Sequence, residues 1–153
     1  MKLEQINKLP TNQLSYIAGF LDGDGSIMVQ IVKNKTYKYG HTIRVTVSFY
    51  QKTKRHWFMI KLRKMLGLKW SIRKRNDGIS EVSLTGFTPI KNFLILIKPH
   101  LILKPRLALL VLQIIEEYSQ VQSEADFLEV CKKIDKTAEY TDSKKRKHTY
   151  SSV

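Results

Sequence analysis

The ten residues His41–Tyr50, HTIRVTVSFY, carry the clearest strand pattern in this chain. Ile43, Val45, Val47 and Phe49 fall on one side of the predicted strand, and polar residues alternate with them on the other side. Such a strand suits an antiparallel sheet that has one apolar face and one polar face. The pattern therefore predicts a sheet with helices packed on one side only.

Periodicity and turn residues predict the remaining elements along the chain. The expected order is a helix from residue 11 to the glycines near 23, strands over 26–32 and 41–50, a helix over 53–66, a hairpin with strands over 69–75 and 79–85, and helices over 88–98, over 105–118 and after 123. Helices that alternate with antiparallel hairpins indicate the α+β class. A length of 153 residues indicates one domain, 1–153, which ends in a basic tail over 138–153.

The charge of the chain indicates a polyanionic partner. The formal net charge is +14, from 27 Lys and Arg against 13 Asp and Glu. Nucleic acid is the first expectation and an anionic membrane surface is the second. A basic protein without such a partner is the remaining alternative.

Several classes of protein are excluded by what the sequence lacks. A single cysteine, Cys131, allows no internal disulfide, and no Cys or His spacing is typical of a zinc site. No apolar run reaches the roughly 18 residues that a membrane span needs. The first residues have no signal-peptide or transit-peptide pattern. We expect a protein of a reducing compartment, without a membrane partner or a small-molecule cofactor.

The polar sides of the predicted strands carry residue types that can recognise bases. They are Gln30, Asn34, Thr42, Arg44, Thr46 and Ser48 in the first hairpin, and Arg73, Arg75, Glu81 and Ser83 in the second. Arginine pairs with guanine, Gln and Asn with adenine, and Glu with cytosine, and a β-ribbon fits the major groove. The simpler interpretation is a solvated face of an amphipathic sheet.

The stretch IAGFLDGDG, Ile17–Gly25, joins the first predicted helix to the first strand. Ala18 and Gly19 are small enough to let two helix backbones approach closely. Asp22 could satisfy free backbone groups at the junction. Asp24 could be a metal ligand, because Mg²⁺ prefers oxygen ligands. Read alone, a stretch rich in Asp and Gly is more often only a turn.

This stretch resembles the LAGLIDADG motif of homing endonucleases. Further segments continue the resemblance along the chain: Thr36–His41, Gln51–Phe58, Lys98–Lys104, Phe127–Cys131 and Asp142–Lys147. The chain is similar to the single-motif, homodimeric branch that is encoded in algal chloroplast group I introns. The resemblance implies an αββαββα fold with additional C-terminal helices, a saddle-shaped sheet of four antiparallel strands over DNA, helices on the outer face of the sheet, and an organellar location, in the chloroplast.

The resemblance also implies a reaction and its residues. A homodimer, joined through Ala18, Gly19 and Asp22, would bind a long pseudo-palindromic site in double-stranded DNA. It would hydrolyse one phosphodiester in each strand and leave 3′ overhangs, which promotes intron homing. The implied catalytic residues are Asp24, Gln51, Arg55 and Lys104, and the implied ligands of Mg²⁺, for which Mn²⁺ could substitute, are Asp24 and the Gly23 carbonyl.

The resemblance adds DNA-binding positions to those on the polar strand faces. They are Val32, Thr36 and Tyr37 near the first hairpin loop, and Ser143, Lys144 and Lys147 near the C-terminal end. Two other functions stay open at this point, an RNA-binding maturase and a non-catalytic DNA-binding regulator. The presence of Asp24, Gln51 and Lys104 together favours cleavage, since a maturase need not keep them. Taken singly, Gln51, Arg55 and Lys104 would look like ordinary surface residues.

Overall fold

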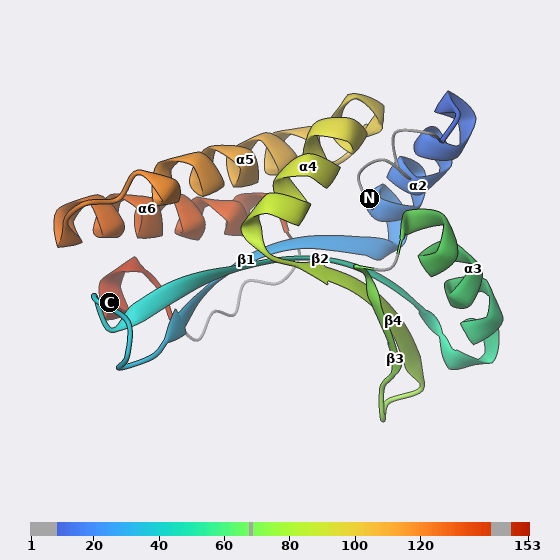
Figure 1. The fold of residues 1–153 in the computed structure, drawn as a ribbon, viewed down its shortest axis with the longest axis horizontal. Helices are drawn as coiled ribbons and strands as arrows, with labels where there is room; N and C mark the ends of the chain where they lie inside the picture. Colours follow the sequence, from blue (N-terminus) through green and yellow to red (C-terminus); the bar gives the residue numbers. More distant parts are fainter. Residues whose placement is uncertain (1–8, 68, 142–147) are drawn as a thin grey trace.

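A curved sheet of four antiparallel strands forms the centre of the computed structural model, which describes residues 9–67, 69–141 and 148–153. The strands are β1 (Gly25–Lys33), β2 (His41–Lys52), β3 (Ser71–Lys74) and β4 (Ile79–Thr85), in the spatial order β1–β2–β4–β3. Figure 1 shows that the sheet arches below the helices and leaves its other face open. The predicted α+β fold with a saddle-shaped sheet is confirmed.

The helices follow the predicted order with small differences. They are α2 (Thr11–Asp24), α3 (His56–Leu66), α4 (Phe87–Ile97), α5 (Pro105–Ser119) and α6 (Glu124–Lys136), with 3₁₀ turns η1 (Thr53–Arg55), η2 (Lys98–His100), η3 (Thr137–Tyr140) and η4 (Tyr150–Ser152). The helix expected from Thr53 begins as a 3₁₀ turn, and β3 is shorter than the strand expected over 69–75. Among the described residues, no helix is long and apolar enough to cross a membrane.

Strand register places the alternating residues on two faces. Gln30 pairs with Arg44 and Val32 with Thr42 in β1 and β2, while Ser48 pairs with Ser83 between β2 and β4. Gly78 has a φ of +81°, and this left-handed conformation closes the predicted Asn-Asp-Gly hairpin. The alternating polar residues of the strands, among them Gln30, Arg44, Ser48 and Ser83, therefore share the concave face.

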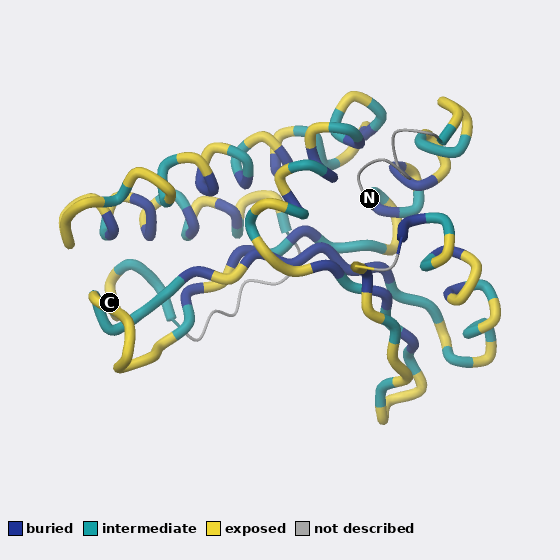
Figure 2. Tube along the Cα trace, viewed as in Figure 1, coloured by how far each residue is buried: buried dark blue, intermediate teal, exposed yellow. Residues whose placement is uncertain are grey.

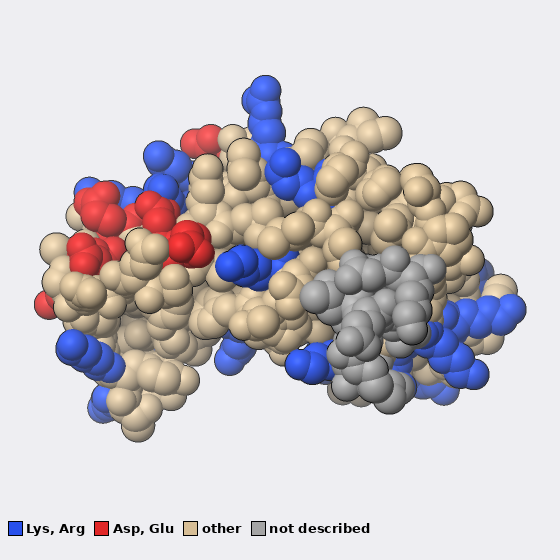
Figure 3. All heavy atoms as spheres, turned by 45° about the horizontal axis from the view of Figure 1, so that its top comes forward, with Lys and Arg blue, Asp and Glu red and all other residues tan. Residues whose placement is uncertain are grey.

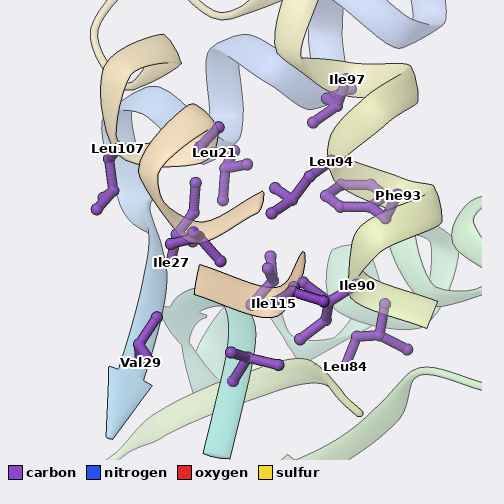
Figure 4. Close-up of a cluster of buried hydrophobic side chains, with 14 of the residues drawn as sticks. Leu21, Ile27, Val29, Leu84, Ile90, Phe93, Leu94, Ile97, Leu107 and Ile115 are labelled. Atoms are coloured by element: carbon purple, nitrogen blue, oxygen red, sulfur yellow. The ribbon is translucent and has the colours of Figure 1, made fainter. Parts of the chain in front are cut away.

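The hydrophobic core lies between the sheet and the helices. Figure 2 shows buried residues along the strands and on the helix sides that face the sheet. Figure 4 shows side chains from α2, β1, β4, α4 and α5 meeting there, among them Leu21, Ile27 and Leu94. The ring of Phe49, which is fully buried, lies 5.4 Å from that of Phe20. This packing fixes the end of α2 against the sheet.

Part of the expected basic tail is packed on the helices. The backbone N–H of Tyr150 donates to the Asp135 carboxylate of α6, at 3.2 Å to Oδ2. The Lys132 Nζ atom lies 5.0 Å from the centre of the Tyr150 ring. Residues 148–153 therefore contact α6.

Candidate active site and nucleic-acid interface

Asp22 fastens the end of α2 to the loop before α5. Its Oδ2 atom accepts hydrogen bonds from the backbone N–H groups of Ile102 (2.7 Å) and Leu103 (3.1 Å), and its Oδ1 atom accepts one from Lys104 (3.0 Å). The expectation that Asp22 satisfies backbone groups is confirmed. Its carboxylate is thus engaged within one protomer.

Lys104 makes the reciprocal connection. Its ammonium donates to the backbone carbonyls of Leu21 (2.7 Å), Asp22 (2.9 Å) and Gly25 (3.0 Å). A cation at the C-terminal end of a helix is favoured by the helix dipole, and it satisfies carbonyls that have no helical partner. A positive charge is therefore held beside the last turn of α2.

Asp24 is the last residue of α2, and its side chain is exposed. Within the described part of the chain, no side chain or backbone group donates a hydrogen bond to its carboxylate. The exposed carboxylate of Asp24 thus follows directly after the exposed residue Gly23.

The Asp24 carboxylate and the Gly23 carbonyl fit Mg²⁺ only as part of a larger site. The described residues contain no cluster of three or more His, Cys, Asp or Glu side chains that could hold a metal ion. Mg²⁺ is commonly held by one or two carboxylates together with substrate phosphates and water, rather than by an all-protein cage. Asp24 and the Gly23 carbonyl therefore suit a magnesium ion that DNA helps to bind.

Gln51 and Arg55 form a pair at the same end of the sheet. Gly25 pairs with Phe49, so β2 runs past the end of α2 and places Gln51 nearby. The Arg55 Nε–H group donates to Gln51 Oε1 at 2.7 Å. All four predicted catalytic residues thus lie at the end of the sheet where α2 stops.

The turn that carries Arg55 is anchored by a contact that sequence reasoning missed. His56 Nδ1 lies 2.7 Å from Ser80 Oγ, and the Ser80 hydroxyl donates to Thr53 Oγ1 at 3.2 Å. Ser80 is fully buried on the helix side of β4. The sequence could not reveal this link, because 24 residues separate His56 from Ser80.

The concave face holds the DNA-binding residues predicted in the first hairpin. Gln30 and Arg44 are exposed side by side, while Val32 and Thr42 are partly buried. The Thr42 hydroxyl lies 3.0 Å from the Tyr118 hydroxyl. In the loop, Asn34 Oδ1 accepts from the Thr36 hydroxyl at 2.7 Å, and Tyr37 is exposed.

A hydrogen-bonded chain connects four predicted DNA-binding residues across three strands. Arg73 pairs with Glu81 at 3.2 Å, the Ser83 hydroxyl donates to Glu81 at 3.1 Å, and the Ser48 and Ser83 hydroxyls are 2.9 Å apart. Ser48 is fully buried, and its contact with DNA stays a prediction. Thr46, its neighbour on the same face of β2, is also buried.

Other residues of the concave face were missed. The Ser26 hydroxyl lies 3.1 Å from the Tyr50 hydroxyl, and the Arg75 guanidinium lies 5.8 Å from the centre of the Tyr50 ring. Met28 pairs with Thr46 on the same face. The two-residue periodicity of β1 could have identified Ser26 and Met28. The predicted positions Ser143, Lys144 and Lys147 lie outside the described residues.

The exposed side of α2 contains small residues, but Ala18 is not one of them. Ala18 is fully buried in the core of its own protomer, and its place at a dimer interface stays a prediction. Gly19 is exposed, and a Cβ atom added at Gly19 or Gly23 would meet nothing within 4 Å. These glycines are four residues apart and share one helix face. Gly23, and not Ala18, accompanies Gly19 there.

Comparison with known proteins agrees with this geometry. The chain is 43% identical over 141 residues to the DNA endonuclease I-CreI of Chlamydomonas reinhardtii, covering 92% of this chain and 85% of that protein. It is 37% identical over 142 residues to the DNA endonuclease I-CvuI of Chlorella vulgaris, covering 90% and 88%.

Solved structures resemble the fold over the same length. The homing endonuclease I-CvuI in complex with its target superposes with a TM-score of 0.85 at 35% identity, covering 92% of this chain and 88% of that one. The family model of the LAGLIDADG endonucleases matches residues 17–104. The chain therefore belongs to the LAGLIDADG endonuclease family.

Proposed function

We propose that this protein is a site-specific homing endonuclease. As a homodimer it binds a long pseudo-palindromic site in double-stranded DNA, hydrolyses one phosphodiester in each strand and leaves 3′ overhangs. The observation that carries the proposal is the end of α2, where the carboxylate of Asp22 is used by the loop and that of Asp24 faces outward. Two neighbouring aspartates thus have separate roles, one structural and one chemical.

Asp24 and the Gly23 carbonyl are the proposed ligands of Mg²⁺, for which Mn²⁺ can substitute. When bound with DNA, the metal would stabilise the attacking and leaving oxygens of the displacement. Gln51 and Arg55 would orient the attacked phosphate and its water, because their mutual hydrogen bond limits their motion. Lys104 contributes a fixed positive charge where negative charge develops.

The concave face is the proposed DNA-binding surface. Its curvature, its polar residues and the net charge of +14 all suit a duplex. The proposed contacts are made by Gln30, Val32, Asn34, Thr36, Tyr37, Thr42, Arg44, Arg73, Arg75, Glu81 and Ser83. Ser143, Lys144 and Lys147 are proposed to contact the DNA backbone.

Two copies of the chain would meet through the exposed glycine face of α2. Gly19 and Gly23 leave room for close approach of a second backbone, and twofold symmetry would bring the two Asp24 residues near one axis. A twofold protein recognises a nearly palindromic site. Since both curated relatives come from algae, we place the gene in a chloroplast intron, whose homing the cleavage promotes.

The test is cleavage of a randomised duplex library, with sequencing of the cut ends. The wild-type protein is incubated with Mg²⁺ or with Ca²⁺, beside Asp24→Asn and the control Glu139→Gln, which changes an exposed carboxylate of η3. We expect wild type and Glu139→Gln, but not Asp24→Asn, to yield one long, nearly palindromic site with 3′ overhangs in Mg²⁺. Binding of a DNA site without cutting would instead indicate a regulator. If the protein neither bound nor cut DNA, an RNA-binding maturase would be the better interpretation.

A further inference from the structure

The outer face of α3 carries an exposed tryptophan among lysines. Trp57 is 59% exposed, and Ile60 beside it is 43% exposed. Lys54, in the turn before the helix, and Lys61 and Lys64 within it are exposed as well. These residues recur at spacings of three and four, so they form one stripe, which we call the α3 stripe.

The α3 stripe lies on the opposite side of the helix from the core. Met59, Leu62 and Leu66 are the buried residues of α3. The neighbouring Phe58 points to α2, with its ring 5.5 Å from that of Phe20. The stripe therefore lies on the outer side of α3, away from the core.

The charge around the stripe is of one sign. Residues 25–76, which include all of α3, contain no Asp or Glu. Figure 3 shows the acidic side chains gathered over the α5–α6 end of the molecule, whereas basic side chains lie over both ends, including the end where α3 lies. The carboxylates of α5 and α6 are partly paired with lysines, as in the 2.6 Å contact between Glu117 and Lys133. The α3 stripe thus favours a polyanion.

The indole restricts the kind of polyanion. The Lys61 ammonium lies 5.5 Å from the centre of the Trp57 ring, so a cation and an exposed aromatic side chain lie next to each other. A duplex offers phosphates but keeps its bases stacked inside. A single strand offers both phosphates and free bases, and stacking of bases on aromatic side chains is how proteins bind single strands without sequence preference.

We propose that the α3 stripe binds single-stranded nucleic acid. One base stacks on Trp57, the Ile60 side chain packs against the edge of that base or the next sugar, and Lys54, Lys61 and Lys64 neutralise the flanking phosphates. DNA and RNA single strands share this chemistry.

Tryptophan fluorescence provides the test, because the chain has two tryptophans of opposite exposure. Trp57 is exposed and Trp70 is 2% exposed. Single-stranded DNA and RNA 12-mers of one sequence are titrated into the purified homodimer at low salt. We expect quenching of Trp57 emission by both strands; a preference for RNA would identify the 2′-hydroxyl as a further contact.

Substitutions separate the stripe from the concave face. In fluorescence-anisotropy titrations of end-labelled strands, which need no tryptophan, Trp57→Ala should weaken single-strand binding by about fivefold or more and leave duplex binding unchanged. Trp57→Phe, which keeps a ring, should retain most of the single-strand affinity. Lys61→Ala should reduce the salt slope of single-strand binding by about 1. Tyr140→Ala removes another exposed aromatic residue and should change neither affinity.

Arg44→Ala is the converse control, since it should weaken duplex binding only. The proposal is overturned if Trp57→Ala leaves single-strand affinity unchanged, or if Arg44→Ala weakens both ligands alike, which would place the single strand in the concave groove. Circular dichroism verifies the fold of each variant. If Trp57→Ala does not fold, the double variant Lys61→Glu, Lys64→Glu must abolish quenching for the proposal to stand.

Discussion

Replacing each aspartate of the motif by asparagine should separate a structural role from a chemical one. Asp22 accepts three backbone hydrogen bonds, two at Oδ2 and one at Oδ1. Asparagine can keep the oxygen at only one of these positions, so its NH₂ group must face an N–H donor. A hydrogen bond to a charged group contributes about 1.5–3 kcal/mol. Asp22→Asn loses one hydrogen bond and weakens the other two. After allowance for partial access of water, its free energy of unfolding should fall by about 2–3 kcal/mol.

Asp24→Asn should change stability by less than about 0.5 kcal/mol, as is usual for exposed positions without partners. Urea unfolding at one protomer concentration measures both variants, since dimer stability depends on concentration. With a slope near 2 kcal/mol per molar urea, the midpoint of Asp22→Asn should fall by about 1–1.5 M. Asp24→Asn should keep its midpoint and its DNA binding but lose cleavage. Equal midpoints for the two variants would refute the assignment of roles.

Three further predictions concern other parts of the molecule. Gly19→Leu should leave the protomer folded but prevent dimerisation, whereas Ala18→Leu should disturb the core, as circular dichroism and sedimentation would show; a dimeric Gly19→Leu variant would argue against the glycine face. If about ten phosphates are neutralised, log affinity should fall against log salt with a slope near −9, and a slope near zero would contradict backbone-dominated binding. Burial, and then the charge of Asp135, raises the pKa of the Cys131 thiol from 9.0 to about 11. The folded state therefore keeps this proton longer than the unfolded chain, so stability should decline as pH rises from about 9 toward 11. Cys131→Ala should lessen that decline in unfolding measured against pH, and an identical decline would assign it to other groups.

Local pattern predicted the sheet well, because a two-residue period depends only on the strand itself. Ile43, Val45, Val47 and Phe49 are buried as expected, and Arg44 is exposed. Ser48 is polar and lies on the same face of β2 as Arg44, yet it is fully buried. Its burial depends on its pairing with Ser83 in β4 and on the curvature of the sheet, neither of which the sequence of β2 contains.

The helix face of α2 shows a second limit of local reasoning. Small size made Ala18 and Gly19 equal candidates for an interface, but neighbouring helical residues point about 100° apart. One of them must then face the core more than the other. Ala18 faces the core. The apolar residues Ile17 and Leu21 mark the core side of the helix in the sequence, and Ala18 is buried together with them.

Asp22 and Lys104 together explain how an exposed carboxylate can be held in a fixed position. The carboxylate of the helix binds the backbone of the loop, and the ammonium of the loop binds the backbone of the helix. Each group satisfies polar atoms that the end of α2 and the loop leave free. Asp24 immediately follows this double connection, so its backbone is fixed while its side chain stays open to solvent. Since Lys104 also belongs to the proposed catalytic set, its removal should lower both stability and cleavage, and the two losses must be measured together before either is assigned to chemistry.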